Sequence, residues 1–224
     1  MIYGIQAAQP ASGGVGGIDY SGATVVLDFE LGVYRVNGVD FAAGDLISKT
    51  DTISASGLLV DYNADTAVPV AKPAVVDAVG NAEWTVLVDL VELESGFASY
   101  PLFMSNLSTG GTGNDFFYLL CNDTTVSFED QPDPGADRTA QITGVASRLA
   151  VRRCVATRTN AKLSVSVNGS AVVSDARASS AHSAISDIML GGDEPGTVTM
   201  NGYIKRVIFY PPKADSALPG LSTP

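Results

Sequence analysis

Short segments in which apolar and polar residues alternate fill most of the chain after residue 24. Residues 83–93 (EWTVLVDLVEL) show the pattern most clearly, because every second side chain from Trp84 to Leu90 is apolar, and they predict a core β-strand. No segment has a sustained apolar period of 3.6 residues, so we expect little helix. Further strands are predicted at residues 24–29, 33–36, 39–41, 58–62, 116–121, 125–129, 149–158, 162–167, 171–174, 188–190 and 203–210.

Turn residues between these segments indicate that successive strands pair in antiparallel fashion. Asn37-Gly38 and Asn168-Gly169 each separate two apolar segments, and Asn-Gly suits the positive φ angles of a type I′ turn. A further hairpin is predicted around Asn160-Ala161. Many short strands with regular turns predict an all-β fold, an antiparallel β-sandwich.

The first 23 residues differ from the remainder of the chain. Residues 11–17 (ASGGVGG) are too rich in small residues to hold regular structure alone. We therefore divide the chain into a flexible N-terminal segment, residues 1–23, and a β-sandwich domain, residues 24–224. The segment either docks on a partner or trails over the domain surface. Its apolar end, the candidate docking patch, includes Met1, Ile2, Tyr3 and Ile5.

Composition and charge exclude several classes of function. Hydrophobic residues make up 46% of the 224 residues, which is enough for a sizeable core. The net charge of −11 argues against nucleic-acid binding, which needs concentrated Lys and Arg. No apolar run is long enough to cross a membrane, and the N-terminus lacks the pattern of a secretory signal. The basic cluster of Arg148, Arg152, Arg153 and Arg158 is expected on the solvated face of a strand.

Cysteine and histidine offer little chemistry. Cys121 and Cys154 each lie inside a predicted strand, and we expect two buried free thiols; a disulfide would require neighbouring strands with suitable Cβ spacing. The single histidine, His182, lies among small polar residues and is expected in a surface loop. The absence of a Cys/His cluster argues against structural zinc.

Four segments together resemble a known family, the concanavalin A-like, laminin-G-type jelly roll. Its typical forms are a strand beginning W-T, then L-x-V-x-V-N-G, I-x-L-G-G and G-x-I-x-x-V-x-I-Y. The resemblance covers roughly residues 83–212, although Lys205-Arg206 stands where the family usually has an acidic pair. It implies that the last strand closes the sandwich beside the N-terminal strand. The matching segments are residues 84–88 (WTVLV), 162–169 (KLSVSVNG), 188–192 (IMLGG) and 202–210 (GYIKRVIFY).

A second resemblance concerns tailed-bacteriophage virion proteins that carry this jelly roll. Residues 27–29 (LDF), 32–39 (GVYRVNGV) and 210–218 (YPPKADSAL) are similar to the beginning and end of such proteins. The resemblance implies a non-enzymatic structural component of a phage or phage-like virion, displayed as a head decoration, fibre or tail-associated protein. Its partners would be other capsid or tail proteins and its own copies, with a trimer favoured. The alternative is a carbohydrate-binding adhesin that recognises host surface glycans.

An enzyme acting on polysaccharide is the third hypothesis. Retaining cleavage needs two carboxyl groups about 5–5.5 Å apart across the sugar bond. Asp89, Glu92 and Glu94 are the nearest candidates, but their spacing turns Asp89 to the face opposite Glu92. We expect them to be solvated carboxylates at the strand end, and therefore expect no enzyme.

No cofactor is expected, although loop carboxylates leave calcium open because hard cations prefer oxygen ligands. The alternative is that these Asn and Asp residues are present because they favour turns. The candidates are Asn114, Asp115, Asn122, Asp123, Asp130, Asp133, Asp137, Asp193 and Glu194.

A glycan-binding surface would combine exposed aromatic rings with loop Asp and Asn residues. Such rings occur near the Gly-rich residues 108–113, although a strand buries every second ring. The aromatic candidates are Tyr100, Phe116, Phe117 and Tyr118. From these, Tyr100 and Phe117 together with Asn114 and Asp115 are our predicted glycan site.

Overall fold

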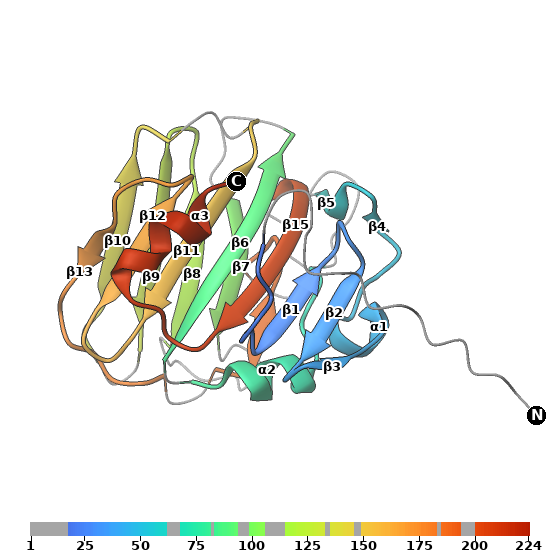
Figure 1. Cartoon of the computed structure of the whole chain (residues 1–224), viewed down its shortest axis with the longest axis horizontal. Helices are drawn as coiled ribbons and strands as arrows, with labels where there is room; N and C mark the ends of the chain where they lie inside the picture. The colour runs from blue at the N-terminus through green and yellow to red at the C-terminus, as the bar shows by residue number, and fades with distance from the viewer. Residues whose placement is uncertain are drawn as a thin grey trace, which may run out of the picture.

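The computed structural model describes residues 18–61, 68–81, 83–93, 99–105, 115–132, 135–145, 149–182, 185–193 and 200–224. The strands of these residues form two antiparallel sheets packed face to face, one of ten strands and one of five. In Figure 1 the ten-stranded sheet faces the viewer and the five-stranded sheet lies largely behind it. The predicted all-β, antiparallel sandwich is therefore confirmed.

Each sheet combines strands from distant parts of the chain. The five-stranded sheet has the order β10 (Arg138–Thr143), β9 (Thr125–Gln131), β8 (Phe116–Cys121), β7 (Ser99–Ser105) and β14 (Asp187–Met189). The ten-stranded sheet has the order β13 (Val173–Asp175), β12 (Leu163–Val167), β11 (Arg152–Arg158), β6 (Trp84–Glu92), β15 (Asn201–Tyr210), β1 (Val25–Asp28), β2 (Val33–Val36) and β3 (Val39–Asp40), while β5 (Gly57–Asp61) also pairs with β15 and β4 (Ile53–Ser54) pairs with β5.

The predicted turns and the closing strand are confirmed. Asn37 and Gly38 have φ angles of 50° and 80°, and Asn168 and Gly169 have 49° and 75°, as a type I′ turn requires. They connect β2 to β3 and β12 to β13. Strand β15 pairs with both β1 and β6, so the last strand does close the sandwich beside the first.

Helix is limited to short elements, as expected from the absence of a 3.6-residue apolar period. Helix α2 begins at Pro73, a position that suits proline because the first helical N–H needs no partner inside the helix. Helix α3 buries Leu218 and Ser222 and packs across β11 and β12 (Figure 1). The helices are α1 (Ala43–Leu46), α2 (Pro73–Val79) and α3 (Leu218–Ser222), with a 3-10 turn at Asp215–Ala217.

Strands β4, β7 and β10 were not predicted; β4 has only two residues, and β7 and β10 depart from a simple apolar–polar alternation. Strand β7 contains Pro101, and its register against β8 shifts between Ser99 and Leu102. Strand β10 turns Arg138 inward along with Ala140 and Ile142, so a charged residue occupies a core position. A pattern that assigns charged residues to solvent misses such a strand.

The main core lies between the sheets. The side chains of β6 predicted to share one face, from Trp84 to Leu90, all belong to it. Trp84 meets Phe117 of the five-stranded sheet edge to face, with ring centroids 4.5 Å apart. Both faces of the ten-stranded sheet are buried near its centre, because Leu87 on the opposite face of β6 is also covered.

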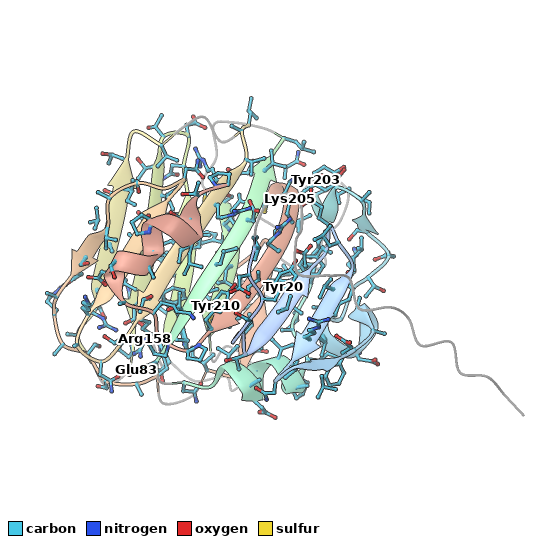
Figure 2. All side chains as sticks on the ribbon, viewed as in Figure 1. Tyr20, Glu83, Arg158, Tyr203, Lys205 and Tyr210 are labelled. Atoms are coloured by element: carbon cyan, nitrogen blue, oxygen red, sulfur yellow. The ribbon has the colours of Figure 1, made fainter. Side chains whose placement is uncertain are left out.

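A second apolar cluster covers the outer face of the ten-stranded sheet. Tyr20 and Leu218 of α3 both contribute to it, and Tyr210 donates a hydrogen bond to the carbonyl oxygen of Asp19 at 3.0 Å. Figure 2 shows Tyr20 and Tyr210 on the face turned to the viewer. Residues 18–23, assigned from sequence to the flexible segment, thus pack on the domain. The predicted docking residues Met1, Ile2, Tyr3 and Ile5 lie outside the described residues.

None of the described helices has the length and apolar character needed to cross a membrane.

Candidate functional site

The outer face of the five-stranded sheet carries an aromatic surface. Alternation along β8 turns Phe116 and Tyr118 outward, where both are half-buried, and turns Phe117 and Leu119 into the core. Because β7 pairs with β8, Phe103 stands opposite Tyr118 on the same face. Tyr100, Phe103, Phe116 and Tyr118 are called the aromatic platform below.

The rings of the platform contact one another in a regular arrangement. Phe103 and Tyr118 have nearly parallel planes, 9° apart, with centroids separated by 5.6 Å. Phe116 lies 5.9 Å from Phe103 and 5.6 Å from Tyr118, with interplanar angles of 21° and 27°. Tyr100 meets Tyr118 edge to face at 5.5 Å. Three rings with similar orientation therefore present a broad, firmly packed apolar surface.

Polar side chains border the aromatic platform on the side of β9 and β10. Glu129 pairs with Tyr118 across the strands and accepts a hydrogen bond from its hydroxyl group. Next to them, the Gln141 side-chain amide donates a hydrogen bond to Ser127 Oγ at 2.9 Å. Carboxylate, amide and hydroxyl groups thus lie beside the rings on one sheet face.

A second carboxylate, that of Asp193, lies close enough to Tyr100 for its charge to act on the phenol. The Gly191 amide donates to the Pro101 carbonyl oxygen at 3.1 Å, which holds this segment against β7. The Oδ1 atom of Asp193 is buried and has no hydrogen-bond donor among the described residues. Burial together with the charges of Asp193 and Glu129 raises the pKa of Tyr100. Its phenol therefore remains protonated and can act as a donor at neutral pH.

Of the four residues predicted to bind glycan, the structure places one on this surface. Tyr100 belongs to the aromatic platform. Phe117 is completely buried against Trp84, so its predicted role is corrected: a core ring cannot contact a ligand. Asp115 is also buried, with its carboxylate turned towards His182. Asn114 lies outside the described residues.

Phe103 and Glu129 of this surface were not considered for the glycan site from sequence, and Phe116 and Tyr118 were considered but not included in it. Phe103 escaped notice because Pro101 and the register shift interrupt the alternation of β7. Glu129 was recognised as part of a strand, but its neighbour across the sheet was unknown. The parity of β8 could have separated Phe116 and Tyr118 from Phe117, since only alternate residues share a face.

His182 is buried between the sheets, so the predicted surface-loop position is wrong. Its Nε2 atom lies 2.7 Å from Oδ1 of Asp130, and its Nδ1 atom lies 3.5 Å from Oδ1 of Asp115. Asp130 also accepts hydrogen bonds from Nε of Arg138 and Nε of Arg158, each at 2.9 Å. Strands β9, β10 and β11 and the segments that contain Asp115 and His182 are thereby connected inside the fold.

Electrostatics in this buried cluster favour the ionised Asp130. Burial acts to raise the pKa of Asp130, but the contact with His182 and the charges of Arg158 and Arg138 outweigh it and lower the pKa to about 2. Asp130 therefore forms ion pairs with two guanidinium groups, and it is not the loop calcium ligand that was considered from the sequence. Within the described part of the chain, no group of His, Cys, Asp or Glu side chains is arranged to hold a metal ion.

The carboxylates considered for catalysis are also buried in ion pairs, so their predicted exposure is wrong. Asp89 lies 2.8 Å from Nη2 of Arg153 on the outer face of the ten-stranded sheet. Glu92 turns to the opposite face, as expected, where Ser99 donates a hydrogen bond to it and Arg152 lies 3.8 Å away. Glu94 lies outside the described residues.

The predicted solvated arginine cluster is corrected by the same observations. Arg152 and Arg158 have no exposed surface and Arg153 is 6% exposed, because each guanidinium neutralises a buried carboxylate. Arg148 lies outside the described residues.

Lys205 and Arg206, the departure from the family pattern, have a structural explanation. Lys205 Nζ lies 2.8 Å from Glu30, and Arg206 pairs with Glu30 and lies 3.3 Å from Asp28. Figure 2 shows Lys205 on β15, which pairs with β1; Asp28 ends β1 and Glu30 follows it. In this chain β15 carries the cations, and β1 together with the residues just after it carries the anions.

Cys121 and Cys154 are free and buried, as predicted. They lie on strands of opposite sheets, and a hydrogen bond between them together with burial raises the pKa of Cys154. Neither thiol is therefore suited to nucleophilic chemistry.

Comparison with known proteins identifies the fold. The sequence matches no family model and no curated protein. The CBM40 domain of the Ruminococcus gnavus IT-sialidase, bound to α2,3-sialyllactose, has a TM-score of 0.58 and 18% identity over 79% of this chain and 98% of that domain. The same domain bound to α2,6-sialyllactose has a TM-score of 0.58 and 17% identity, with 74% and 93% coverage.

A third similar structure, the leech intramolecular trans-sialidase, has a TM-score of 0.57 and 12% identity over 74% of this chain and 26% of its own. At these identities the similarity concerns the fold. The chain adopts the jelly-roll architecture of these carbohydrate-binding domains.

Proposed function

We propose that this protein is a carbohydrate-binding domain whose ligand face is the outer face of the five-stranded sheet. The observation that carries the proposal is the aromatic platform with the hydrogen-bonding groups of β9 and β10 beside it. Its fold is similar to that of domains solved with sialyllactose, which supports a sugar ligand without defining the sugar.

The chemistry of the surface suits a sugar. A pyranose ring has an apolar face of C–H groups and a rim of hydroxyl groups. The packed rings of Phe103 and Tyr118 offer an apolar surface to the C–H groups of the sugar. The carboxylates of Glu129 and Asp193 and the amide of Gln141 offer hydrogen-bond partners to the hydroxyl groups of the sugar. A mainly apolar surface with a few polar groups is the usual composition of a small-ligand site.

The ion pairs of Asp89 and Glu92 support a role in binding rather than in catalysis. Asp89 and Glu92 point to opposite faces of β6, and each is buried against arginine, so the pair cannot flank a glycosidic bond. We therefore propose a non-enzymatic protein.

Display on a phage or phage-like virion remains a separate proposal that rests on the sequence resemblance alone. In that setting an exposed glycan-binding face would meet the host surface, and both roles would operate together. Immunogold labelling of intact particles tests the location: specific labelling supports it, and a protein found only outside purified particles contradicts it.

A glycan array tests the binding proposal. Phe103→Ala and Tyr118→Ala should each reduce binding about 5–30-fold, which corresponds to about 1–2 kcal/mol for a truncated aromatic contact. Phe41→Ala is the matched control, because Phe41 is an exposed aromatic at the end of β3, outside the aromatic platform. Absence of binding to every glycan by the folded wild-type protein would overturn the proposal.

A further inference from the structure

We infer that the ligand of the aromatic platform is a neutral glycan, and that a carboxylate-bearing sugar such as sialic acid is disfavoured there. The inference rests on the proposed function and specifies its ligand class. The charges around the aromatic platform carry it, and it separates this chain from the domains of similar fold that were solved with sialyllactose.

The charged groups known to act on the aromatic platform are acidic. Glu129 contacts Tyr118 directly, and both Glu129 and Asp193 act on Tyr100. After burial, the hydrogen bond and charge of Glu129 are the main influences that raise the pKa of Tyr118. Neither phenol experiences a comparable influence from a cation.

Recognition of a sugar carboxylate is strongest when an arginine side chain pairs with it. No lysine or arginine belongs to the described residues of β7, β8, β9 or β14. The one arginine of β10, Arg138, points inward and is paired with Asp130. An anionic sugar would therefore meet two carboxylates here without a neighbouring guanidinium group on the sheet.

The other cations are engaged in different parts of the fold. Arg177 is linked to the five-stranded sheet through its partner Asp175, which accepts a hydrogen bond from the Thr139 amide of the edge strand β10. The Asp175 carboxylate neutralises Arg177. Lys49 lies between α1 and β4, and Arg148 lies outside the described residues. The remaining pairs are Arg35 with Asp40, Lys72 with the Gly44 carbonyl, Arg152 with Glu92, Arg153 with Asp89, Arg158 with Asp130, Lys162 with Asp215, Lys205 and Arg206 with Glu30, and Lys213 with the Tyr210 ring.

Neutral hydroxyl groups, in contrast, match what the surface offers. A sugar hydroxyl can donate to the carboxylate of Glu129, which lies at the edge of the aromatic platform. It can also accept from the Gln141 amide or from a tyrosine hydroxyl. Binding of this kind depends little on ionic strength, because the ligand carries no charge to be screened.

The test uses pairs of oligosaccharides that differ only in a terminal sialic acid, measured against the full chain by array and then by calorimetry. The desialylated member should bind at least about tenfold more tightly, a difference of about 1.4 kcal/mol. Glu129→Gln removes one carboxylate charge while keeping an acceptor for Tyr118, and should strengthen binding of the sialylated member about two- to fivefold. Asp77→Asn is the charge-matched control, since Asp77 is exposed on α2, which packs against β1 and β2.

The outcomes separate the inference from the proposed function. Equal or tighter binding of sialylated glycans, lost in Tyr118→Ala, would overturn the neutral-ligand inference and keep the carbohydrate-binding proposal. Lack of binding by either member of every pair would overturn both. Preference for the desialylated member that is reduced by Glu129→Gln and unchanged in Asp77→Asn supports both.

Discussion

The hydroxyl group of Tyr118 donates a hydrogen bond to the carboxylate of Glu129, its partner across β8 and β9. This contact joins the aromatic and the polar parts of the surface in one cross-strand pair. It fixes the position of the Tyr118 hydroxyl group at the border of the aromatic platform. A change at either residue therefore separates the contribution of the apolar face from that of the hydrogen bond.

Substitution of Tyr118 distinguishes these two contributions. Tyr118→Phe keeps the ring and removes only the hydroxyl group, so we expect at most about threefold weaker glycan binding, in line with the net value of one hydrogen bond. Tyr118→Ala also removes the ring and should cost about 5–30-fold. Calorimetric titration with a glycan selected from the array measures both. Equal losses in the two variants would mean that the ring face makes no contact.

Neighbouring phenylalanines on β8 should respond in opposite ways. Phe117 is fully buried against Trp84 and Phe128, so Phe117→Ala should destabilise the fold by about 3–5 kcal/mol. Phe116 is half-buried on the outer face, so Phe116→Ala should cost much less stability and instead weaken glycan binding. Urea denaturation monitored by circular dichroism gives the stabilities. A larger loss of stability in Phe116→Ala would contradict the assigned faces.

Apolar–polar alternation predicts β6, β8 and β12 from sequence, but it does not predict which charged side chains are buried. A period of two places Trp84 and Leu163 correctly in the core, because one face of each strand packs on the other sheet. The rule that charged side chains face solvent assigns Arg158 to the surface, whereas Asp130, a residue of the other sheet, neutralises it in the interior. Asp130 and Arg158 are 28 residues apart in sequence, and the order of the strands brings them together. A local sequence pattern carries no information about strand order.

The candidate site was predictable to a smaller extent than the fold. An aromatic-rich segment at β8 pointed to the sheet that carries the candidate site, but the proposed binding face depends on the β7 pairing that brings Phe103 beside Tyr118. The register shift within β7 hides this pairing from any fixed period. His182 illustrates the same difficulty, since its small polar neighbours suggest a surface loop while its ring packs against Asp130.

The buried Asp130 should make stability depend on pH in the acid range. Its pKa in the folded protein is about 2, below the usual value of 3.8, so its contribution is complete above about pH 4 and is lost as the pH falls towards 2. The contribution is about 2 kcal/mol. Arg138, Arg158, His182 and Asp115 face it in the buried cluster.

Denaturant unfolding at several pH values between 5 and 2, in wild type and Asp130→Asn, measures this contribution. The variant should be less stable at pH 5, because two buried guanidinium groups lose their counter-charge, and its stability should fall less steeply on acidification. Asp77→Asn, on exposed α2, should keep the wild-type slope. Parallel curves for wild type and Asp130→Asn would show that Asp130 titrates normally.

The two thiols should be inert in the folded protein. Cys121 and Cys154 are buried and free, and the pKa of Cys154 is raised, so little thiolate is present at neutral pH. We expect no change in Tm on addition of dithiothreitol, slow alkylation of the native protein and rapid addition of two alkyl groups in urea. Mass spectrometry counts the adducts. A reductant-dependent Tm would indicate a disulfide instead.

Gly202, the first residue of the G-x-I motif, should tolerate no side chain. A Cβ atom at this position would lie 2.3 Å from the Val91 carbonyl oxygen and 2.7 Å from the Cα atom of Glu92, so backbone atoms of β6 would have to move. Gly202→Ala should therefore cost about 3 kcal/mol or more. Gly220→Ala is the control, because no atom lies within 4 Å of its Cβ position and alanine favours the helix α3. Thermal denaturation compares the two, and a Gly202→Ala protein as stable as the Gly220→Ala protein would contradict the close approach of β15 to β6.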